Sequence, residues 1–333
     1  MDKRRDPVQA RNEGLDLQDV VDWEQRTILD TAAVVLYRAL VFATRAFVVV
    51  LALLILVTEI ALGTLGTILA NPTIGAMALL SAVPALGLAV YIWRADITSP
   101  EPLMLLVGTF LLGVLFAGFA GVLNTTLPGL FGTLGIDIGM VGFFYLIVGP
   151  VEEGVKLLAV RLYPFRDDRF DAVIDGAVYG AVAGLGFATI ENALYISQNV
   201  AQVGHGQNLL LVGSSISAVR ALAGPGHVIY SAFSGYYLGL AKFNPENAGP
   251  IVVKGLLIAA LIHGTYNTLS LFAPQLLADM FGLNWVGGFL LFVIVFDTVF
   301  GFLLFQKLRA YRLAYKRVYS RPEPRSEPTE FDP

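Results

Sequence analysis

Eight long apolar stretches alternate with short polar segments along this chain, and they set its fold class. Each stretch is close to the roughly 20 residues that an α-helix needs to cross the hydrocarbon core of a bilayer. The pattern therefore predicts an all-α protein, a polytopic membrane helix bundle with about eight transmembrane helices. The expected spans are 46–69, 75–93, 103–124, 139–160, 173–196, 217–241, 251–272 and 287–306.

The segments before and after the apolar stretches are polar. Between Leu15 and Thr44, apolar residues recur among charged ones, a pattern typical of a helix that lies at the membrane surface. We therefore expect a cytoplasmic N-terminal segment with an interfacial helix at 1–45, a transmembrane domain at 46–306, and a cytoplasmic tail at 307–333. The tail is basic at first and then rich in proline and charge, which predicts disorder in its last part.

Lysine and arginine residues are confined to alternate loops. The N-terminal segment up to Arg45 holds seven of the 22, and the tail from Lys307 holds another seven. The loops at 70–74, 125–138, 197–216 and 273–286 contain none. Because cytoplasmic loops of membrane proteins collect Lys and Arg, this segregation predicts that both termini are cytoplasmic. We therefore expect a multi-pass protein of the cell membrane.

Composition narrows the possible functions. Apolar residues make up 56% of the 333 and charged residues 14%, and the mean hydropathy is +0.69. Soluble domains carry about a quarter charged residues, so the expected surroundings are a lipid bilayer. The chain contains no cysteine, which excludes disulfides and thiolate metal sites. The net charge of -4 argues against a nucleic-acid partner.

The stretch GPVEEGVKLLAV, from Gly149 to Val160, places three charges inside a predicted span. Charged side chains at membrane depth are costly, so they need partners and usually mark a functional site. On a helix, Lys156 lies about 40° from Glu152 and about 60° from Glu153 around the axis. It can neutralise either carboxylate, which leaves the other to take up a proton, hold a water or bind a metal. An ion pair that only fixes helix packing is the alternative, but it leaves the second glutamate unexplained.

The fifth and sixth predicted spans carry further charges. Phe187 and Glu191 are four residues apart, hence on one helix face, with Asn192 next to the acid. Arg220 lies in the following span. A purely structural interpretation is that Arg220 neutralises Glu191.

Two of the three histidines also fall inside predicted spans. His227 ends the sequence GPGH, in which Pro225 removes a backbone donor, and such breaks are tolerated at membrane depth where they face protein or a water-filled cavity. His263 and Asn267 lie four residues apart in the seventh span, on one face. The structural alternative is that these side chains only link helices by hydrogen bonds.

Depth within the bilayer indicates which of these groups can meet. At 1.5 Å per residue from the predicted cytoplasmic ends, Glu152 lies roughly 13 Å deep, His263 roughly 18 Å and His227 roughly 22 Å. These three can share a layer. Glu191 lies roughly 24 Å deep or more, so its side chain has to reach inward, or its span has to tilt, to join them.

Together these motifs resemble those of the PrsW-type intramembrane proteases, within the larger group that includes the CAAX prenyl endopeptidases. The matching residues are Glu152-Glu153-x-x-Lys156, Phe187-x-x-x-Glu191 with Asn192, His227, His263-x-x-x-Asn267 and the stretch SPEPL at Ser99–Leu103. The resemblance covers about residues 85–272 and implies that 46–306 is a protease-like domain. CAAX enzymes have a histidine where this chain has Glu191, which argues against prenylated substrates.

The resemblance implies an intramembrane endopeptidase that cuts membrane-embedded or membrane-adjacent proteins, for example a single-span regulatory protein. Peptide hydrolysis needs an activated water and a group that stabilises the developing oxyanion. We expect Glu152 to activate the water, with Glu153 and Lys156 adjusting its proton affinity.

Metal use stays open at the level of sequence. Glu191, His227 and His263 are candidate ligands for a divalent metal, zinc above all, because zinc favours imidazole nitrogen and carboxylate oxygen. In the metal-free alternative, Glu152 and a histidine activate the water directly, while His263 and Asn267 donate to the oxyanion.

Two other classes of protein fit parts of the pattern. A proton- or ion-coupled transporter also carries Glu, Lys and His at membrane depth. It would show internal repeats and paired broken helices, whereas the sequence has no evident repeat and one clear break, near Pro225. A noncatalytic membrane scaffold is the third class.

Overall fold

The computed structural model describes residues 25–61, 63, 65–127, 136–202 and 208–319. These residues form helices and connecting turns, and no strand occurs among them, which confirms the all-α prediction. Eight helical segments in this part of the chain are long and apolar enough to cross a membrane. The expected number of spans is therefore confirmed.

Several spans are built from more than one consecutive element. The span Pro72–Ala95 contains α4 and α5, and the span Ile138–Arg166 contains α7, a π-helical turn, α8 and a short 3-10 turn. The described helices are α2 (Ile28–Ala61), α3 (Gly66–Ala70), α4 (Pro72–Ser81), α5 (Val83–Ala95), α6 (Leu103–Thr126), α7 (Ile136–Phe143), η3 (Phe144–Val148), α8 (Gly149–Leu162), η4 (Pro164–Arg166), α9 (Val173–Ala201), α10 (Leu209–Lys242), η5 (Pro245–Asn247), α11 (Ala248–Ser270), α12 (Ala273–Phe281) and α13 (Trp285–Tyr319).

The chain divides into two compact units, Met1–Leu51 and Ala52–Pro333. In the first unit, a reciprocal cap starts α2: the Thr27 hydroxyl accepts from the Asp30 N–H at 3.1 Å, and the Asp30 carboxylate accepts from the Thr27 N–H at 2.7 Å. Helix α2 then runs to Ala61 without a break, so the described part of the expected interfacial helix is continuous with the first span. The remainder of that expected helix, residues 15–24, lies outside the described residues.

Several predicted span boundaries differ from the observed ones, and three of these differences have a clear description in the structure. The first span ends at Ala61 rather than at residue 69, because Gly63 adopts a left-handed φ of 76° that no helix continues through. Helix α10 begins at Leu209 rather than at 217, with the Asn208 side chain capping its first turn. Helix α13 continues past residue 306 to Tyr319, and the expected disordered end of the tail lies outside the described residues.

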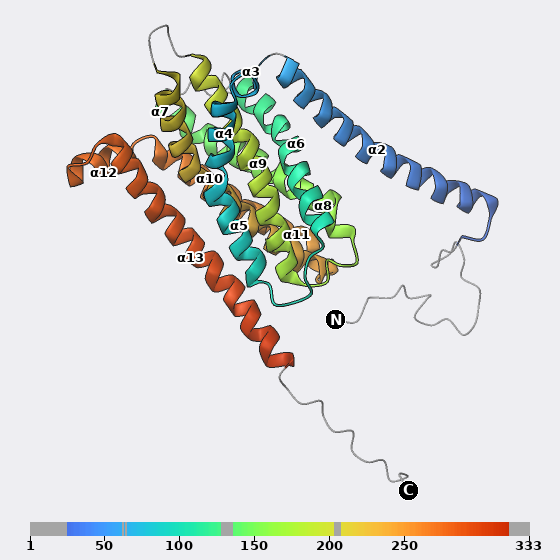
Figure 1. The fold of residues 1–333 in the computed structure, drawn as a ribbon. Helices are drawn as coiled ribbons and strands as arrows, with labels where there is room; N and C mark the ends of the chain where they lie inside the picture. The colour runs from blue at the N-terminus through green and yellow to red at the C-terminus, as the bar shows by residue number, and fades with distance from the viewer. Residues whose placement is uncertain (1–24, 62, 64, 128–135, 203–207, 320–333) are drawn as a thin grey trace. The chain divides into compact units, whose positions relative to one another are not determined.

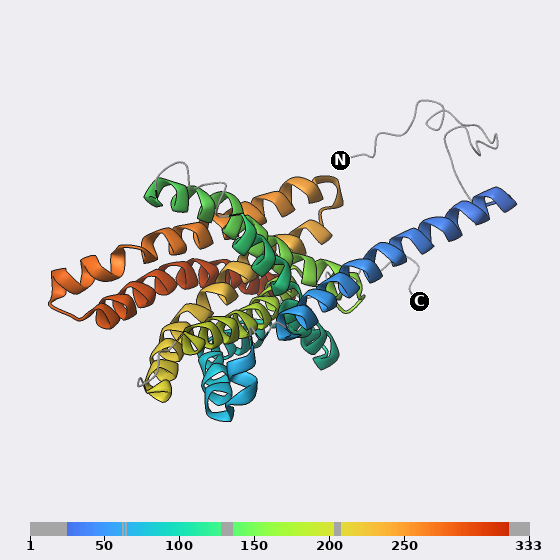
Figure 2. The same cartoon turned by 90° about the horizontal axis from the view of Figure 1, so that it is seen from above.

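Helix α9 is the most buried element of the second unit and packs against α10, α6, α5 and α8 (Figures 1 and 2). Three glycines at four-residue spacing let α9 and α10 approach until their backbones touch. A Cβ atom at these positions would collide with backbone oxygens of α10: Gly176 with Gly235, Gly180 with Ser231, and Gly184 with His227. This contact places His227 directly against α9, which also carries Phe187 and Glu191.

The Gly180→Ala variant is expected to be destabilised by about 1–3 kcal/mol, because its new methyl group has to displace the backbone of α10. The matched control is Gly87→Ala in α5, where no atom lies within 4 Å of the added Cβ. Alanine favours helix over glycine, so the control should be neutral or slightly stabilised. Thermal unfolding of the purified variants measures both, and equal stability of the two would contradict this packing.

The orientation of the termini stays a prediction, and the absence of native cysteine makes it simple to test. Single cysteines at the exposed positions Asp168 and Glu246 should resist an impermeant thiol reagent added outside the cell. A single cysteine at the exposed position Gln275 should react, since its loop contains no Lys or Arg. Outside labelling at position 168 would overturn the assigned topology.

Candidate active site

The two adjacent carboxylates lie near the start of α8, Glu152 in its first turn, and are almost fully buried, Glu152 at 2% exposure and Glu153 at 0%. A Cβ on Gly149, at the start of this helix, would lie 2.6 Å from the backbone oxygen of Ala260. Glycine therefore allows α8 to pack closely on α11. Because α11 also carries His263, this packing brings the acid pair and the histidine together.

Lys156 pairs more closely with Glu153 than with Glu152. Its Nζ lies 2.7 Å from Glu153 Oε1 and 3.8 Å from Glu152 Oε2, and it also lies 2.9 Å from His227 Nδ1. The ammonium group sits over the Phe187 ring, 4.2 Å from its centroid. The ion pair with Glu153 leaves Glu152 as the carboxylate without a close counter-ion. The sequence had allowed Lys156 to neutralise either of the two.

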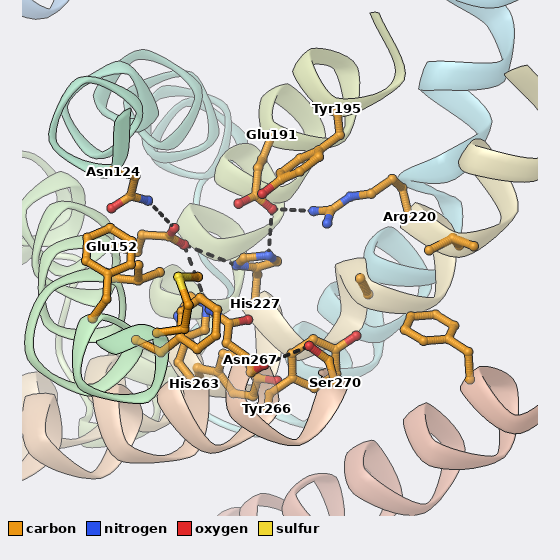
Figure 3. A pocket seen from close by; sticks show the side chains of 18 residues that line it. Asn124, Glu152, Glu191, Tyr195, Arg220, His227, His263, Tyr266, Asn267 and Ser270 are labelled. Carbon is orange, nitrogen blue, oxygen red and sulfur yellow. Dashed lines mark hydrogen bonds and ion pairs between the residues drawn. The ribbon is translucent and has the colours of Figure 1, made fainter. Parts of the chain in front are cut away.

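Glu152 faces a cavity of about 470 Å³ (Figure 3). Its Oε1 accepts a hydrogen bond from Asn124 Nδ2 at 2.9 Å. Its Oε2 is buried and has no hydrogen-bond partner within the described part of the chain. A buried carboxylate oxygen of this kind is costly unless a water, an ion or a substrate group completes it.

The two histidines are each fixed by a carboxylate. His263 Nδ1 lies 3.0 Å from Glu153 Oε1, and His227 Nε2 lies 3.0 Å from Glu191 Oε2. Since an ionised carboxylate only accepts, these contacts assign the ring protons to His263 Nδ1 and His227 Nε2. The lone pairs are then on the opposite nitrogens.

Those opposite nitrogens face Glu152. His263 Nε2 lies 3.6 Å and His227 Nδ1 4.0 Å from Glu152 Oε2. One possible ligand atom from each of Glu152, His227 and His263 lies within 4.8 Å of the other two. Two imidazole lone pairs and an unpartnered carboxylate oxygen form a donor set that suits a zinc-like ion. The residues present therefore fit a metal, provided that the Lys156 ammonium, which lies 2.9 Å from the same His227 nitrogen, gives up that contact.

Glu191, which we expected among the metal ligands, does reach the site despite its calculated depth. It forms an ion pair with Arg220, as the structural interpretation of that arginine required. Arg220 Nε also donates to Asn192 Oδ1 at 2.9 Å, and Asn192 Nδ2 donates to Ser81 Oγ at 3.1 Å. Glu191 is thus held by a polar network that links α4, α9 and α10, and it orients His227.

Asn267 lines the same cavity, one helical turn beyond His263 (Figure 3). Sequence reasoning missed two residues that contact the acid pair: Asn124, and Ser231, whose hydroxyl donates to Glu153 Oε2 at 3.3 Å. Asn124 could have been noticed as an amide at the end of an apolar span. Asparagine is also common where a span meets a loop, so this position alone did not indicate a functional role. Ser231 had no distinguishing sequence context.

The profile of one protein family, described as PrsW family intramembrane metalloprotease, matches residues 101–299, more than half of the chain. The chain belongs to the PrsW family. The resemblance inferred from the motifs is therefore confirmed, and every residue of the acid and histidine cluster lies within the matched range.

Curated relatives agree with this assignment. Protease PrsW of Bacillus subtilis (strain 168) is 32% identical over 214 residues, which cover 61% of this chain and 88% of that protein. Protease PrsW of Geobacillus kaustophilus (strain HTA426) is 31% identical over 188 residues, covering 56% and 76%. No solved structure matches. The chain is a membrane protease of the multi-pass type, and its substrates are membrane-associated.

The Lys156→Met variant is expected to lose about 3–5 kcal/mol of stability, because it leaves the fully buried Glu153 carboxylate without its cation. Adding Glu153→Gln should recover part of that loss by removing the unpaired charge. The control is Arg169→Met, which breaks an ion pair with Asp167 that is open to water and should leave unfolding unchanged. Equal unfolding temperatures for Lys156→Met and wild type would show that the buried pair contributes nothing.

Proposed function

We propose that this protein is an intramembrane endopeptidase that uses Glu152 as its proton acceptor and cuts single-span membrane proteins. The observation that carries the proposal is the Oε2 atom of Glu152, which is buried, lacks a hydrogen-bond partner among the described residues and faces a cavity in a predicted membrane span. A water held there has a carboxylate to take its proton and two imidazoles next to it.

In the proposed reaction, a water gives a proton to Glu152 Oε2 while its oxygen attacks the peptide carbonyl carbon. The carbonyl oxygen becomes an oxyanion, for which the side-chain amide of Asn267 is the proposed donor. The proton on Glu152 then passes to the amide nitrogen as the C–N bond breaks, so that a carboxylic acid and an amine leave. Asn124 holds the other oxygen of Glu152 throughout, which keeps Oε2 directed at the cavity.

We further propose a metal-bound form of the site, in which Glu152, His227 and His263 would hold a divalent metal, zinc above all, and Glu152 Oε2 would be a ligand rather than the proton acceptor. When bound, such an ion would lower the pKa of water and supply positive charge to the oxyanion. This donor set replaces Glu191 of our sequence-based expectation by Glu152, because Glu191 is engaged by Arg220 and by His227 Nε2. Glu153 and Glu191 then serve to fix the tautomers of His263 and His227, as carboxylates behind metal-binding histidines do.

The test of this function is cleavage by the purified protein in liposomes. A panel of single-span membrane proteins is incubated with wild type, Glu152→Gln and the exposed control Glu246→Gln, and fragments are identified by mass spectrometry. Wild type and the control should give the same fragments, cut within or next to the span, and Glu152→Gln should give none. Identical fragments from all three samples would assign the cleavage to a contaminating protease.

A further inference from the structure

A second cluster of acids lies outside the cavity just described. Asp96 follows α5, Glu101 precedes α6, and Asp175 lies in the first turn of α9. One carboxylate oxygen from each of the three lies within 4.8 Å of the others. None of the three lines the Glu152 cavity, and 16 helical residues, roughly 24 Å, separate Asp175 from Glu191 along α9.

Local hydrogen bonds hold one oxygen of two of these acids and leave the other oxygen with at most one long contact. Asp96 Oδ1 accepts from the N–H and the hydroxyl of Thr98, both at 2.7 Å. Asp175 Oδ2 accepts from the N–H groups of Asp171 at 2.8 Å and Ala172 at 3.0 Å. These bonds fix both carboxylates, so their second oxygens are presented to the cluster in a set orientation.

The free oxygens lack donors. Asp96 Oδ2 and both oxygens of Glu101 are buried and have no hydrogen-bond partner within the described ranges. Asp175 Oδ1 has one long contact, 3.4 Å from the Thr98 hydroxyl. Glu101 is 6% exposed and Asp175 1% exposed, so water satisfies little of this need.

No counter-ion contacts the cluster within the described segments, although Asp175 interacts at longer range with Lys242, whose ammonium donates to the Phe165 and Asp167 carbonyl oxygens. No lysine or arginine of the described segments forms an ion pair with any of the three acids. Arg94 lines the adjoining cavity of about 200 Å³, but it is exposed. Three carboxylates this close repel one another strongly unless a cation or protons enter among them. Burial and the neighbouring Asp96 carboxylate raise the pKa of Glu101 to about 8, so a proton is the competing solution.

We propose that Asp96, Glu101 and Asp175 bind a hard divalent cation of the Ca²⁺ and Mg²⁺ class. All available donors are oxygens, which Ca²⁺ and Mg²⁺ prefer. Zinc-like ions usually also take nitrogen or sulfur ligands, and the cluster has none. Oxygens up to 4.8 Å apart suit ligand distances of about 2.3–2.6 Å, the range for Ca²⁺, without contraction. The bound cation joins the segments that start α6 and α9, the helices that supply Asn124 and Glu191 to the Glu152 cavity.

Terbium luminescence tests the proposal, because Trp93 lines the same small cavity as Asp96 and Glu101. Tb³⁺ added to the purified, chelator-treated protein and excited through tryptophan should give a saturable signal that Ca²⁺ displaces. Glu101→Gln should weaken Tb³⁺ binding at least about tenfold, since it removes a charged ligand. Asp96→Asn is the second variant, should Glu101→Gln fail to fold. Ca²⁺ should also raise the unfolding temperature of wild type and not that of Glu101→Gln.

Three controls locate the signal. Asp168→Asn removes an exposed acid outside the cluster and should bind Tb³⁺ like wild type. Glu152→Gln should also bind like wild type, because the cluster is separate from the Glu152 cavity. Trp93→Phe should lose the luminescence and keep the stabilisation by Ca²⁺. Three results would each overturn the proposal. The first is a wild-type protein with neither a saturable signal nor stabilisation by Ca²⁺, which is expected if two of the carboxyl groups share a proton instead of binding a cation. The others are a Glu101→Gln variant that binds Tb³⁺ as wild type does, and loss of the signal in Glu152→Gln.

Discussion

Replacing Glu152 with glutamine is expected to lower kcat by about 10²–10⁴-fold and to leave KM and folding almost unchanged. Glutamine has the same size, and its side-chain oxygen can keep the hydrogen bond from Asn124 Nδ2. An amide can neither take a proton from water nor bind a divalent metal as well as a carboxylate does, so the variant loses the function of Oε2 in both forms of the proposed site. Cleavage rates of a substrate identified with wild type, at several substrate concentrations in liposomes, measure kcat and KM separately.

The matched control for this variant is Glu246→Gln, an exposed acid at the start of the 3-10 turn before α11. It should cut at the wild-type rate. If Glu152→Gln retains a kcat within twofold of wild type, the proton acceptor is a different group.

Removal of bound metal is expected to abolish cleavage, and addition of Zn²⁺ to restore it. The reason lies in the two imidazole lone pairs that the carboxylates of Glu153 and Glu191 direct toward Glu152. His263→Ala deletes one of these donors and should lower both the metal content and the activity. Elemental analysis of wild type before and after chelation, paired with cleavage rates, is the measurement.

The control for the metal experiment is the Asp168→Asn variant. It retains His227 and His263 and should keep the wild-type metal content. Fully active wild-type protein that contains no stoichiometric metal would contradict the proposed centre. Glu152 would then act as the base of a metal-free glutamate-dependent protease, the alternative that the sequence left open.

The span count and the main polar residues could be predicted because both depend on local sequence. A charged or imidazole side chain inside a long apolar run stands out from its neighbours, and its position along the run is fixed by the helical rise. Glu152, Lys156, His227 and His263 were found in this way, and the structure brings all four together.

The depth count required the Glu191 side chain to reach inward, and the direction of side chains on a helix explains how it does so. Side chains on a helix tilt toward its N-terminus. Helices α9 and α10 run in opposite directions, so the Glu191 and His227 side chains tilt toward each other. The calculated depths of these two residues differ by only roughly 2 Å, and the two side chains meet at 3.0 Å.

Contacts made across distant segments could not be read from one sequence. Nothing near Ser231 distinguishes it from Ser234, yet the backbone contact between α9 and α10 determines which hydroxyl reaches Glu153. The early end of α2 depended on one glycine adopting a positive φ, and glycine also occurs within helices of this chain. Such choices follow from packing in three dimensions.

The backbone contact between α9 and α10 also limits how a polypeptide can reach the water proposed to lie beside Glu152. The three glycines have no side chain that could rotate to open a path between the helices. Opening a path there would require the two backbones to separate along their whole contact. The cavity wall formed by Met140, Phe143 and Phe144 consists instead of side chains on α7 and a π-helical turn, and π-helical turns are frequent where function needs local rearrangement. We therefore expect a polypeptide substrate to enter from the α7 side, where bulkier side chains should slow the capture of long polypeptides more than the cutting of short ones.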